Sequence, residues 1–205
     1  VANQADDTVS VIDTATNTVS ATVTVGSGPF GVAASPDNSK VYVANYYSDT
    51  VSVIDTATNT ITATVAVGTG PVGVAVSPDN SKVYVANRSS DTVSVIDAAS
   101  NAVIITVTTG RFPYGVSVSP DNSKVYVASN LNGNLSVINT ADNTVTATLD
   151  LDGGYTFGNF IGPALDPEPV PTAVPTLSQW AMIGLGLLLA GLALIQVQRV
   201  RRTPA

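Results

Sequence analysis

The 205-residue chain contains neither cysteine nor histidine. Without them the chain alone can form no disulfide, and it cannot build the usual zinc, copper, haem or iron–sulfur sites. The Ser-His-Asp and Cys-His nucleophile systems are excluded for the same reason. We therefore expect no cofactor and no metal site, and cysteine usage indicates nothing about the redox compartment.

Charged residues are also scarce, at 11% of the chain, and they are unevenly distributed. Residues 1–180 contain fifteen acidic and five basic side chains, for a net charge of −10, whereas the last seven residues contain three arginines. Phosphate contacts need clustered Lys and Arg, so an acidic body argues against nucleic acid as a partner. We interpret the acidity as a contribution to solubility.

An internal repeat of 42 residues dominates the first three quarters of the chain. The phrase SPDNSKVYVA occurs three times, beginning at Ser35, Ser77 and Ser119, and VSVID recurs with the same period. Between Gly26–Val67 and Gly68–Thr109, 29 of 42 positions are identical without a gap. A fixed period of this length is typical of repeat architectures.

Each repeat has the pattern of four short strands. Val, Ile, Thr and Tyr fill the strands, and Pro, Asp, Asn, Ser and Gly fill the turns. In the second repeat we predict strands at 73–77, 82–86, 92–97 and 102–108. The inner strands are apolar on both faces, which is typical of strands covered on both sides. The fourth strand alternates between apolar and polar residues, which is typical of a strand covered on one side. The sequence therefore predicts an all-β protein of four-stranded propeller blades, at 26–67, 68–109 and 110–152.

The phrases YVAN (Tyr42–Asn45 and Tyr84–Asn87), SPDNSK and VSVIDTATNTV resemble the YVTN family of β-propeller repeats. The resemblance extends from residue 1 to about residue 150. It implies the propeller fold, often with seven blades. It implies no particular activity, because such repeats occur in many surface and periplasmic proteins.

The opening blade is incomplete, because residues 1–25 carry only three strand patterns. With one residue inserted, Phe157–Ile161 aligns with Phe30–Ala34, the start of a first strand. We predict that the segment 157–162 pairs with Val1–Asn3 and completes this blade, since such closure leaves no free sheet edge between the chain ends.

This arrangement gives four blade equivalents, at the low end for a propeller. Either the chain forms a small ring, or it is a piece of a larger one. The chain begins Val-Ala-Asn-Gln without Met or a signal peptide, so we expect that processing or truncation removed the natural start.

The loops that differ among the repeats suggest a binding face. The turn between the second and third strands varies, as does the loop between blades (Ser27–Phe30, Thr69–Val72, Arg111–Tyr114). In an up-and-down blade these two loops lie on the same side. Drift in solvent-exposed loops explains the variation equally well, but aromatic and Arg side chains are enriched among interface anchors. The candidate contacts are Tyr46, Tyr47, Arg88, Arg111, Phe112 and Tyr114.

The residues that recur in every repeat have simpler interpretations. We expect Asp37, Asp79 and Asp121, which follow proline, to bond to backbone amides two residues on rather than to bind metal. We expect the repeated tyrosines (Tyr42, Tyr84, Tyr126) to pack in blade cores and the repeated lysines (Lys40, Lys82, Lys124) to be exposed to solvent. No acid pair outside these turns suggests a catalytic couple, so we expect no enzyme.

The C-terminal segment has a different composition from the repeats. Residues 163–175 contain five prolines and predict a semi-rigid linker. Residues 176–198 predict a transmembrane helix, because the 18 residues from Trp180 to Val197 have one polar side chain, Gln196, and span roughly 27 Å as a helix. The basic tail 199–205 is expected in the cytoplasm, which puts the propeller on the other side of the membrane.

This segment also resembles the IPTL-CTERM class of bacterial sorting domains, with Val174 in place of the family's Ile. The residues that carry the resemblance are Pro175, Thr176, Leu177, Ser178, Trp180, Arg199, Arg201 and Arg202. It implies recognition by an exosortase-type membrane transpeptidase, cleavage near the Pro-Thr-Leu phrase, and delivery from the inner membrane to the cell surface. A permanent C-terminal anchor is the alternative.

The sequence therefore predicts an exported cell-surface or envelope propeller that acts without catalysis in binding, adhesion or structure. Its partners would be the membrane, the transpeptidase, and a surface ligand or matrix component of unknown identity. A periplasmic propeller enzyme or redox accessory subunit with a permanent anchor is the alternative function.

Overall fold

The computed structural model describes residues 1–131 and 133–151. The chain divides into two compact units, Val1–Ala164 and Leu165–Ala205, and the description below concerns the first. Within the described residues no helix is long and apolar enough to cross a membrane. The predicted closing segment 157–162, the linker 163–175, the transmembrane helix 176–198 and the tail 199–205 lie outside them.

Four antiparallel sheets follow one another along the chain, which confirms the all-β, propeller-like prediction. The first sheet has three strands, β1 (Ala2–Asn3), β2 (Thr8–Asp13) and β3 (Thr18–Thr24). The second has β4 (Pro29–Ala34), β5 (Lys40–Asn45), β6 (Thr50–Asp55) and β7 (Thr60–Ala66). The third has β8 (Pro71–Val76), β9 (Lys82–Asn87), β10 (Thr92–Asp97) and β11 (Ala102–Thr108). The fourth has β12 (Pro113–Val118), β13 (Lys124–Ser129), β14 (Asn134–Asn139) and β15 (Val145–Asp150).

The strand bounds follow the sequence pattern closely, with one systematic difference. The innermost strand of the second full repeat begins at Pro71 and ends at Val76, instead of the predicted 73–77. Proline fits the first position of a strand, where its missing N–H removes no central ladder bond. In every sheet the pairing of the two outer strands shifts register at the same place. In the second sheet this shift lies between Val53 and Ile54, and its recurrence indicates a repeated β-bulge.

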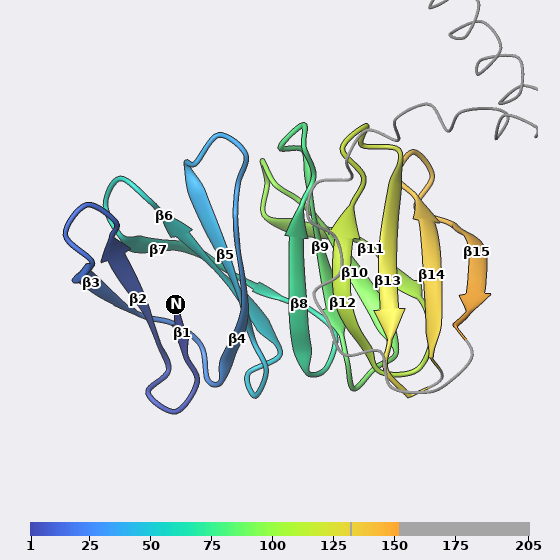
Figure 1. Cartoon of the computed structure of the whole chain (residues 1–205), viewed down its shortest axis with the longest axis horizontal. Coiled ribbons are helices and arrows are strands. Elements are labelled where there is room, and N and C mark those ends of the chain that lie inside the picture. Colours follow the sequence, from blue (N-terminus) through green and yellow to red (C-terminus); the bar gives the residue numbers. More distant parts are fainter. Residues whose placement is uncertain (132, 152–205) are drawn as a thin grey trace, which may run out of the picture. The chain divides into compact units, whose positions relative to one another are not determined.

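The innermost strands β4, β8 and β12 lie side by side near the middle of Figure 1. Glycine permits their close approach. A Cβ atom on Gly31 would lie 2.0 Å from the Val72 carbonyl oxygen, and one on Gly73 would lie 2.2 Å from that of Tyr114. No side chain can occupy either position while the strands keep this spacing, so these glycines set the distance between neighbouring blades.

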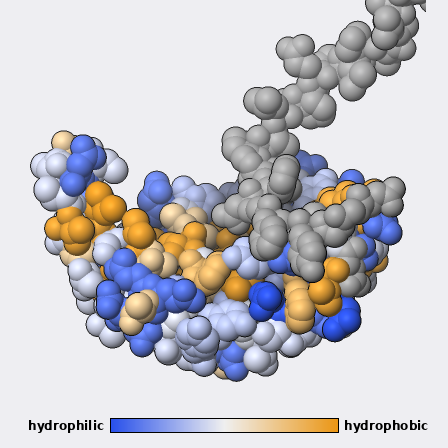
Figure 2. All heavy atoms as spheres, turned by 60° about the horizontal axis from the view of Figure 1, so that its bottom comes forward, coloured by the Kyte–Doolittle hydropathy of each residue, from blue (hydrophilic) through white to orange (hydrophobic). Residues whose placement is uncertain are grey.

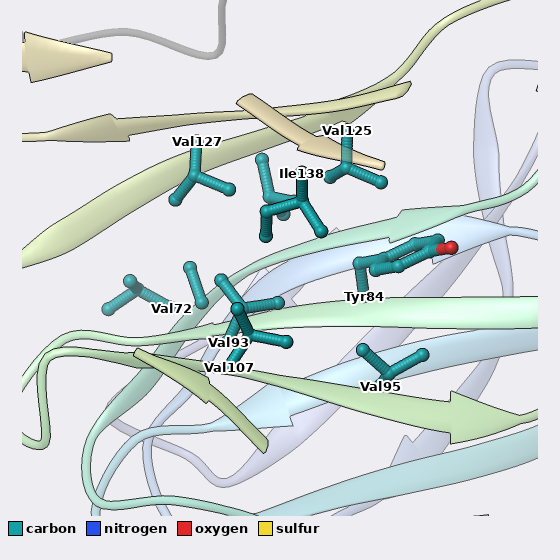
Figure 3. Packing of buried hydrophobic residues seen from close by; sticks show 10 residues of the cluster. Val72, Tyr84, Val93, Val95, Val107, Val125, Val127 and Ile138 are labelled. Atoms are coloured by element: carbon teal, nitrogen blue, oxygen red, sulfur yellow. The ribbon is translucent and has the colours of Figure 1, made fainter. Parts of the chain in front are cut away.

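The core lies between consecutive sheets. The second and third sheets are apolar on both faces, and each packs against the sheet before it and the sheet after it. Figure 3 shows the third junction, where Tyr84, Val93, Val95 and Val107 face Val125, Val127 and Ile138. Tyr42 and Tyr84 are fully buried, as predicted, whereas Tyr126 in the last sheet is only half-buried.

The first sheet has no innermost strand among the described residues, which leaves the second sheet partly uncovered. Val32 on β4 is 41% exposed, whereas its counterpart Val116 on β12 is 6% exposed. Among the described residues, the edge of β1 has no neighbouring strand. The segment 157–162 is predicted to pair there, and that pairing stays a prediction.

The junction packing predicts a strongly position-dependent effect of truncation. Ile96 is fully buried between the second and third sheets, whereas Ile104 on the outer strand is 51% exposed. We expect Ile96→Ala to lower the free energy of unfolding by about 2–5 kcal/mol, because it removes packed methylene groups and leaves a cavity. Ile104→Ala should change it by less than about 0.5 kcal/mol. Urea unfolding of the full chain in mild detergent, followed by circular dichroism, compares them, and equal effects would contradict the stacked-sheet core.

Candidate binding face

The two loops that vary among the repeats pair with each other in every full blade. The Tyr46 amide donates to the Gly28 carbonyl at 2.8 Å, and the Arg88 amide donates to the Gly70 carbonyl at 2.9 Å. In the fourth sheet the Asn130 amide donates to the Phe112 carbonyl at 2.9 Å. The variable loops therefore lie at the same end of each blade, as the sequence predicts, and their backbone groups are already paired.

Aspartates fix these loops to the preceding blade. Asp7, Asp49 and Asp91 each accept a 2.8 Å hydrogen bond from an amide of the next inter-blade loop, at Gly28, Gly70 and Phe112. Each of the three adopts a left-handed backbone, with φ between 54° and 57°. Asp tolerates this conformation better than most residues. Sequence reasoning missed this role, because each carboxylate reaches a partner 21 residues further on.

A shallow groove of about 300 Å³ opens on this face. Figure 2 shows hydrophobic surface in a hollow of this unit, between hydrophilic edges. Four of the six predicted contacts line the groove (Tyr46, Tyr47, Arg88, Tyr114), together with four residues that the prediction missed (Gln4, Phe30, Val72, Asn130). Phe30 stands in the variable loop Ser27–Phe30, so the loop comparison could have identified it.

Arg88 is the centre of the face. Its guanidinium carbon lies 4.9 Å from the centroid of the Phe112 ring, and its Nη1 donates to the Tyr46 hydroxyl at 3.4 Å. The guanidinium of Arg111 lies 5.8 Å from the same ring centroid. Arg111 and Phe112 are the two predicted contacts that do not line the groove. The Phe112 ring lies against Arg88, which does line it, and Arg111 lies beside the same ring. Among the residues that the structure describes, neither arginine forms an ion pair, so each retains capacity for an anion.

Aromatic pairs surround this arginine. Tyr46 and Tyr47 are in T-shaped contact with centroids 5.1 Å apart, and Phe30 and Tyr114 are in T-shaped contact at 5.6 Å. A hydrogen bond with the Ser89 hydroxyl, and to a lesser extent one from Arg88, lowers the pKa of the Tyr46 phenol. The face combines flat aromatic rings with two guanidinium groups that have no ion-pair partner among the described residues.

Phe112 has a strained backbone. It occupies the loop position of Gly28 and Gly70, whose φ angles are 67° and 65°, and it keeps this left-handed conformation with a φ of 54°. A bulky residue there is an outlier and costs about 1–3 kcal/mol. Strain of this kind is often retained at functional sites.

The repeated turn acids are structural, as predicted. The Asp37 carboxylate accepts bonds from the Ser35 hydroxyl at 2.6 Å and the Ser39 amide at 3.0 Å. These bonds, chiefly that from Ser35, lower the pKa of Asp37 to about 2, and the equivalent bonds do the same for Asp121. In the part of the chain that the structure describes, no group of His, Cys, Asp or Glu could hold a metal ion.

The prediction of exposed lysines is wrong for two of the three. Lys40 and Lys82 are partly buried, because each reaches across a junction to the next sheet. The Lys40 ammonium donates to the Ala98 carbonyl at 2.7 Å, and that of Lys82 donates to the Thr140 carbonyl at 2.5 Å. Lys124 in the last sheet is exposed, as expected.

Comparison with family models supports both parts of the sequence interpretation. Residues 1–81 match the YNCE-like beta-propeller, and residues 56–151 match the lactonase, 7-bladed beta-propeller. Residues 172–202 match the IPTL-CTERM motif. The chain is thus a propeller repeat protein with an IPTL-CTERM motif, which implies export and membrane-linked sorting.

Comparison with individual proteins extends the likeness to solved structures. The chain is similar to Kuenenia stuttgartiensis hydrazine synthase (TM-score 0.61, 32% identity), covering 62% of this chain and 37% of that one. The U3-55K structure and the RRP9 WD40 repeats share the fold (both TM-score 0.58, 16% identity, 62% of this chain and 40% of theirs). A 36-residue stretch, 18% of this chain, is 61% identical to the PE-PGRS family protein PE_PGRS18 of Mycobacterium tuberculosis (strain ATCC 25618 / H37Rv) and covers 8% of it. The chain spans well under half of each of these proteins.

The strain at Phe112 predicts an unusual order of stabilities. Ala keeps the cost of a Cβ in the left-handed region and Gly does not, so we expect Phe112→Gly to be more stable than Phe112→Ala by about 1 kcal/mol. Phe30 in β4 has no positive φ, and there the order should reverse, with Gly the less stable by about 0.5–1 kcal/mol. Urea unfolding of the four variants provides the measurement. If the alanine variant were more stable than the glycine variant at both positions, the strained backbone at Phe112 would be contradicted.

Proposed function

We propose that this propeller repeat protein is an exported, non-catalytic binding module of the cell surface, and that its groove binds acidic glycans. The observation that carries the proposal is Arg88, a guanidinium without a carboxylate partner among the described residues, held between Phe112 and Tyr46. A guanidinium pairs bidentately with a carboxylate, and flat aromatic surfaces beside it suit the apolar face of a sugar ring.

Paired backbone groups favour a glycan over a peptide as the ligand. Extended peptides commonly bind by adding a strand to a free sheet edge. In this face the loop amides of Tyr46, Arg88 and Asn130 already donate to carbonyls of the neighbouring loop. A ligand of this face would therefore be contacted mainly by side chains. Aromatic rings and guanidinium groups suit a ligand that carries a sugar ring and a carboxylate.

The net charge of −10 over residues 1–180 is compatible with an acidic ligand of short length. Charges separated by more than about 8 Å are largely screened at physiological ionic strength. Arg88 and Arg111 stand next to the groove without an ion-pair partner among the described residues, whereas the nearby carboxylates of Asp7, Asp49 and Asp91 each already accept a hydrogen bond from a loop amide.

The IPTL-CTERM match supports presentation at the cell surface. In this proposal an exosortase-type transpeptidase recognises the Pro175-Thr176-Leu177 phrase while the apolar segment holds the precursor in the inner membrane. Cleavage then releases the propeller for delivery outward. The segment would act as a sorting signal, and a permanent anchor is the competing arrangement.

A propeller enzyme is the second candidate, because residues 56–151 match a lactonase family model. Two observations favour binding. The chain lacks histidine and cysteine. The turn carboxylates of Asp37 and Asp121, whose pKa values are lowered to about 2, are poor general acids near neutral pH. Turnover of a lactone by the purified chain would overturn the non-catalytic assignment.

The glycan proposal predicts selective binding of a uronic acid tetrasaccharide over the same compound with its carboxyl groups reduced to alcohols. Arg88→Ala should weaken this binding about tenfold, since a charge-assisted hydrogen bond contributes about 1.5–3 kcal/mol. Lys124→Ala removes one charge at the other end of the blade and should have no effect. Isothermal titration calorimetry measures the affinity of the wild-type chain and of both variants for the two compounds. Equal binding of the reduced compound, or of an acidic peptide, would refute the assignment.

The sorting proposal predicts a shortened mature protein. Intact-mass spectrometry of the surface-exposed form should find a C-terminus upstream of the apolar run that begins at Trp180. Replacing Pro175, Thr176 and Leu177 together by alanine should leave the precursor uncleaved and retained in the membrane fraction. A surface form that extends to Ala205 would instead establish the permanent anchor.

A further inference from the structure

Tyr47 presents an aromatic ring to solvent at the groove. It lines the groove together with Tyr46 and Arg88, and its side chain is 69% exposed. The ring packs against the backbone of Gly28, where an added Cβ atom would lie 2.9 Å from Cε2 of Tyr47 and closer still to Cδ2. A side chain at Gly28 would therefore displace the ring from this position.

Backbone and ring contacts hold Tyr47 in place. Its amide donates to the Ser27 carbonyl at 3.1 Å, and the amide of the preceding Tyr46 donates to the Gly28 carbonyl at 2.8 Å. The rings of Tyr46 and Tyr47 are in T-shaped contact, at an interplanar angle of 88°. A side chain that is already ordered loses little conformational freedom when a ligand binds, so this ring is pre-organised for a contact.

The exposed ring belongs to one blade, and the fold does not require it. The third blade has Ser89 at this repeat position and the fourth has Leu131. The Ser89 side chain packs on Gly70 as Tyr47 packs on Gly28. The matching turns of the blades before and after, residues 4–7 and 88–91, both belong to the described part of the chain, so the exposure of Tyr47 does not arise at an end of the unit.

Charge divides the groove into two adjoining sites. Arg88 is the charged residue among the described residues that line the groove, and its Nη1 donates to the Tyr46 hydroxyl at 3.4 Å. The turn that carries Tyr47 contains instead the carboxylate of Asp49, which accepts from the Gly70 amide at 2.8 Å. An anionic group of a ligand is therefore matched at Arg88 and unmatched at Tyr47.

We propose that the groove selects a glycan in which a uronate alternates with a neutral hexose, the uronate pairing with Arg88 and the neighbouring neutral ring packing on Tyr47. This inference rests on the proposed function and extends its uronate site by one sugar. The C–H groups on the face of a neutral pyranose pack on an aromatic ring, and its hydroxyls remain in the solvent that reaches Tyr47.

A homopolymer of uronate fits the same groove less well. It carries a second carboxylate to the Tyr47 site, where the charge loses hydration and gains no cation. Selection against such a ligand comes from this unmatched charge, as is common where two ligands share most of their contacts.

Isothermal titration calorimetry of the full chain in mild detergent tests the selection with two tetrasaccharides, one alternating uronate with neutral hexose and one containing uronate alone. The alternating compound should bind about fivefold more tightly, although it carries half the charge. Tyr47→Ser introduces the residue that the third blade has here, so the circular dichroism spectrum should not change. This variant should weaken binding of the alternating compound about tenfold and leave binding of the homopolymer unchanged.

Two further variants separate the ring from the rest of the side chain. Tyr47→Phe keeps the ring and should retain the preference for the alternating compound. Tyr47→Arg replaces the ring with a cation and should reverse the preference, so that the homopolymer binds more tightly.

Nuclear magnetic resonance supplies a readout that does not depend on affinity. Ring protons of the neutral hexose should shift upfield in the complex with the wild-type chain, because they lie over an aromatic ring, and should not shift with Tyr47→Ser. Equal binding of both compounds that Tyr47→Ser leaves unchanged would overturn this inference while the proposed function stands. Failure of both compounds to bind would overturn the proposed function and this inference with it.

Discussion

Packing of one apolar sheet face on the next is the constraint on which this molecule depends. A blade buries Val, Ile and Tyr on both of its sides, so it needs two neighbours where an ordinary amphipathic sheet needs one. The 42-residue period satisfies this need, because the same pair of surfaces packs together at each junction between successive repeats. Gly31 and Gly73 permit the same close approach of neighbouring inner strands at two successive junctions.

The two ends of each blade are stabilised in different ways, and the difference leaves one of them available for function. At the SPDNSK end the serine hydroxyls bond to the turn aspartate, and lysine closes the junction. A change of side chain there would break the turn or the junction. At the other end the loops are joined by backbone hydrogen bonds and by Asp49 and its counterparts. Residues such as Tyr46, Arg88 and Phe112 can therefore vary without loss of the fold, and a strained Phe112 is tolerated.

The sequence predicted what depends on local chemistry and missed what depends on stacking. Strand periodicity and turn residues act over a few positions, so strands such as Thr92–Asp97 were located correctly. The lysine contacts were missed because Lys40 finds its acceptor in another sheet, 58 residues away. The candidate face was largely predicted from differences among loops. Val72 and Asn130 were missed although they occupy the repeat positions of Tyr114 and Arg88, because the candidates were chosen for their aromatic or Arg side chains.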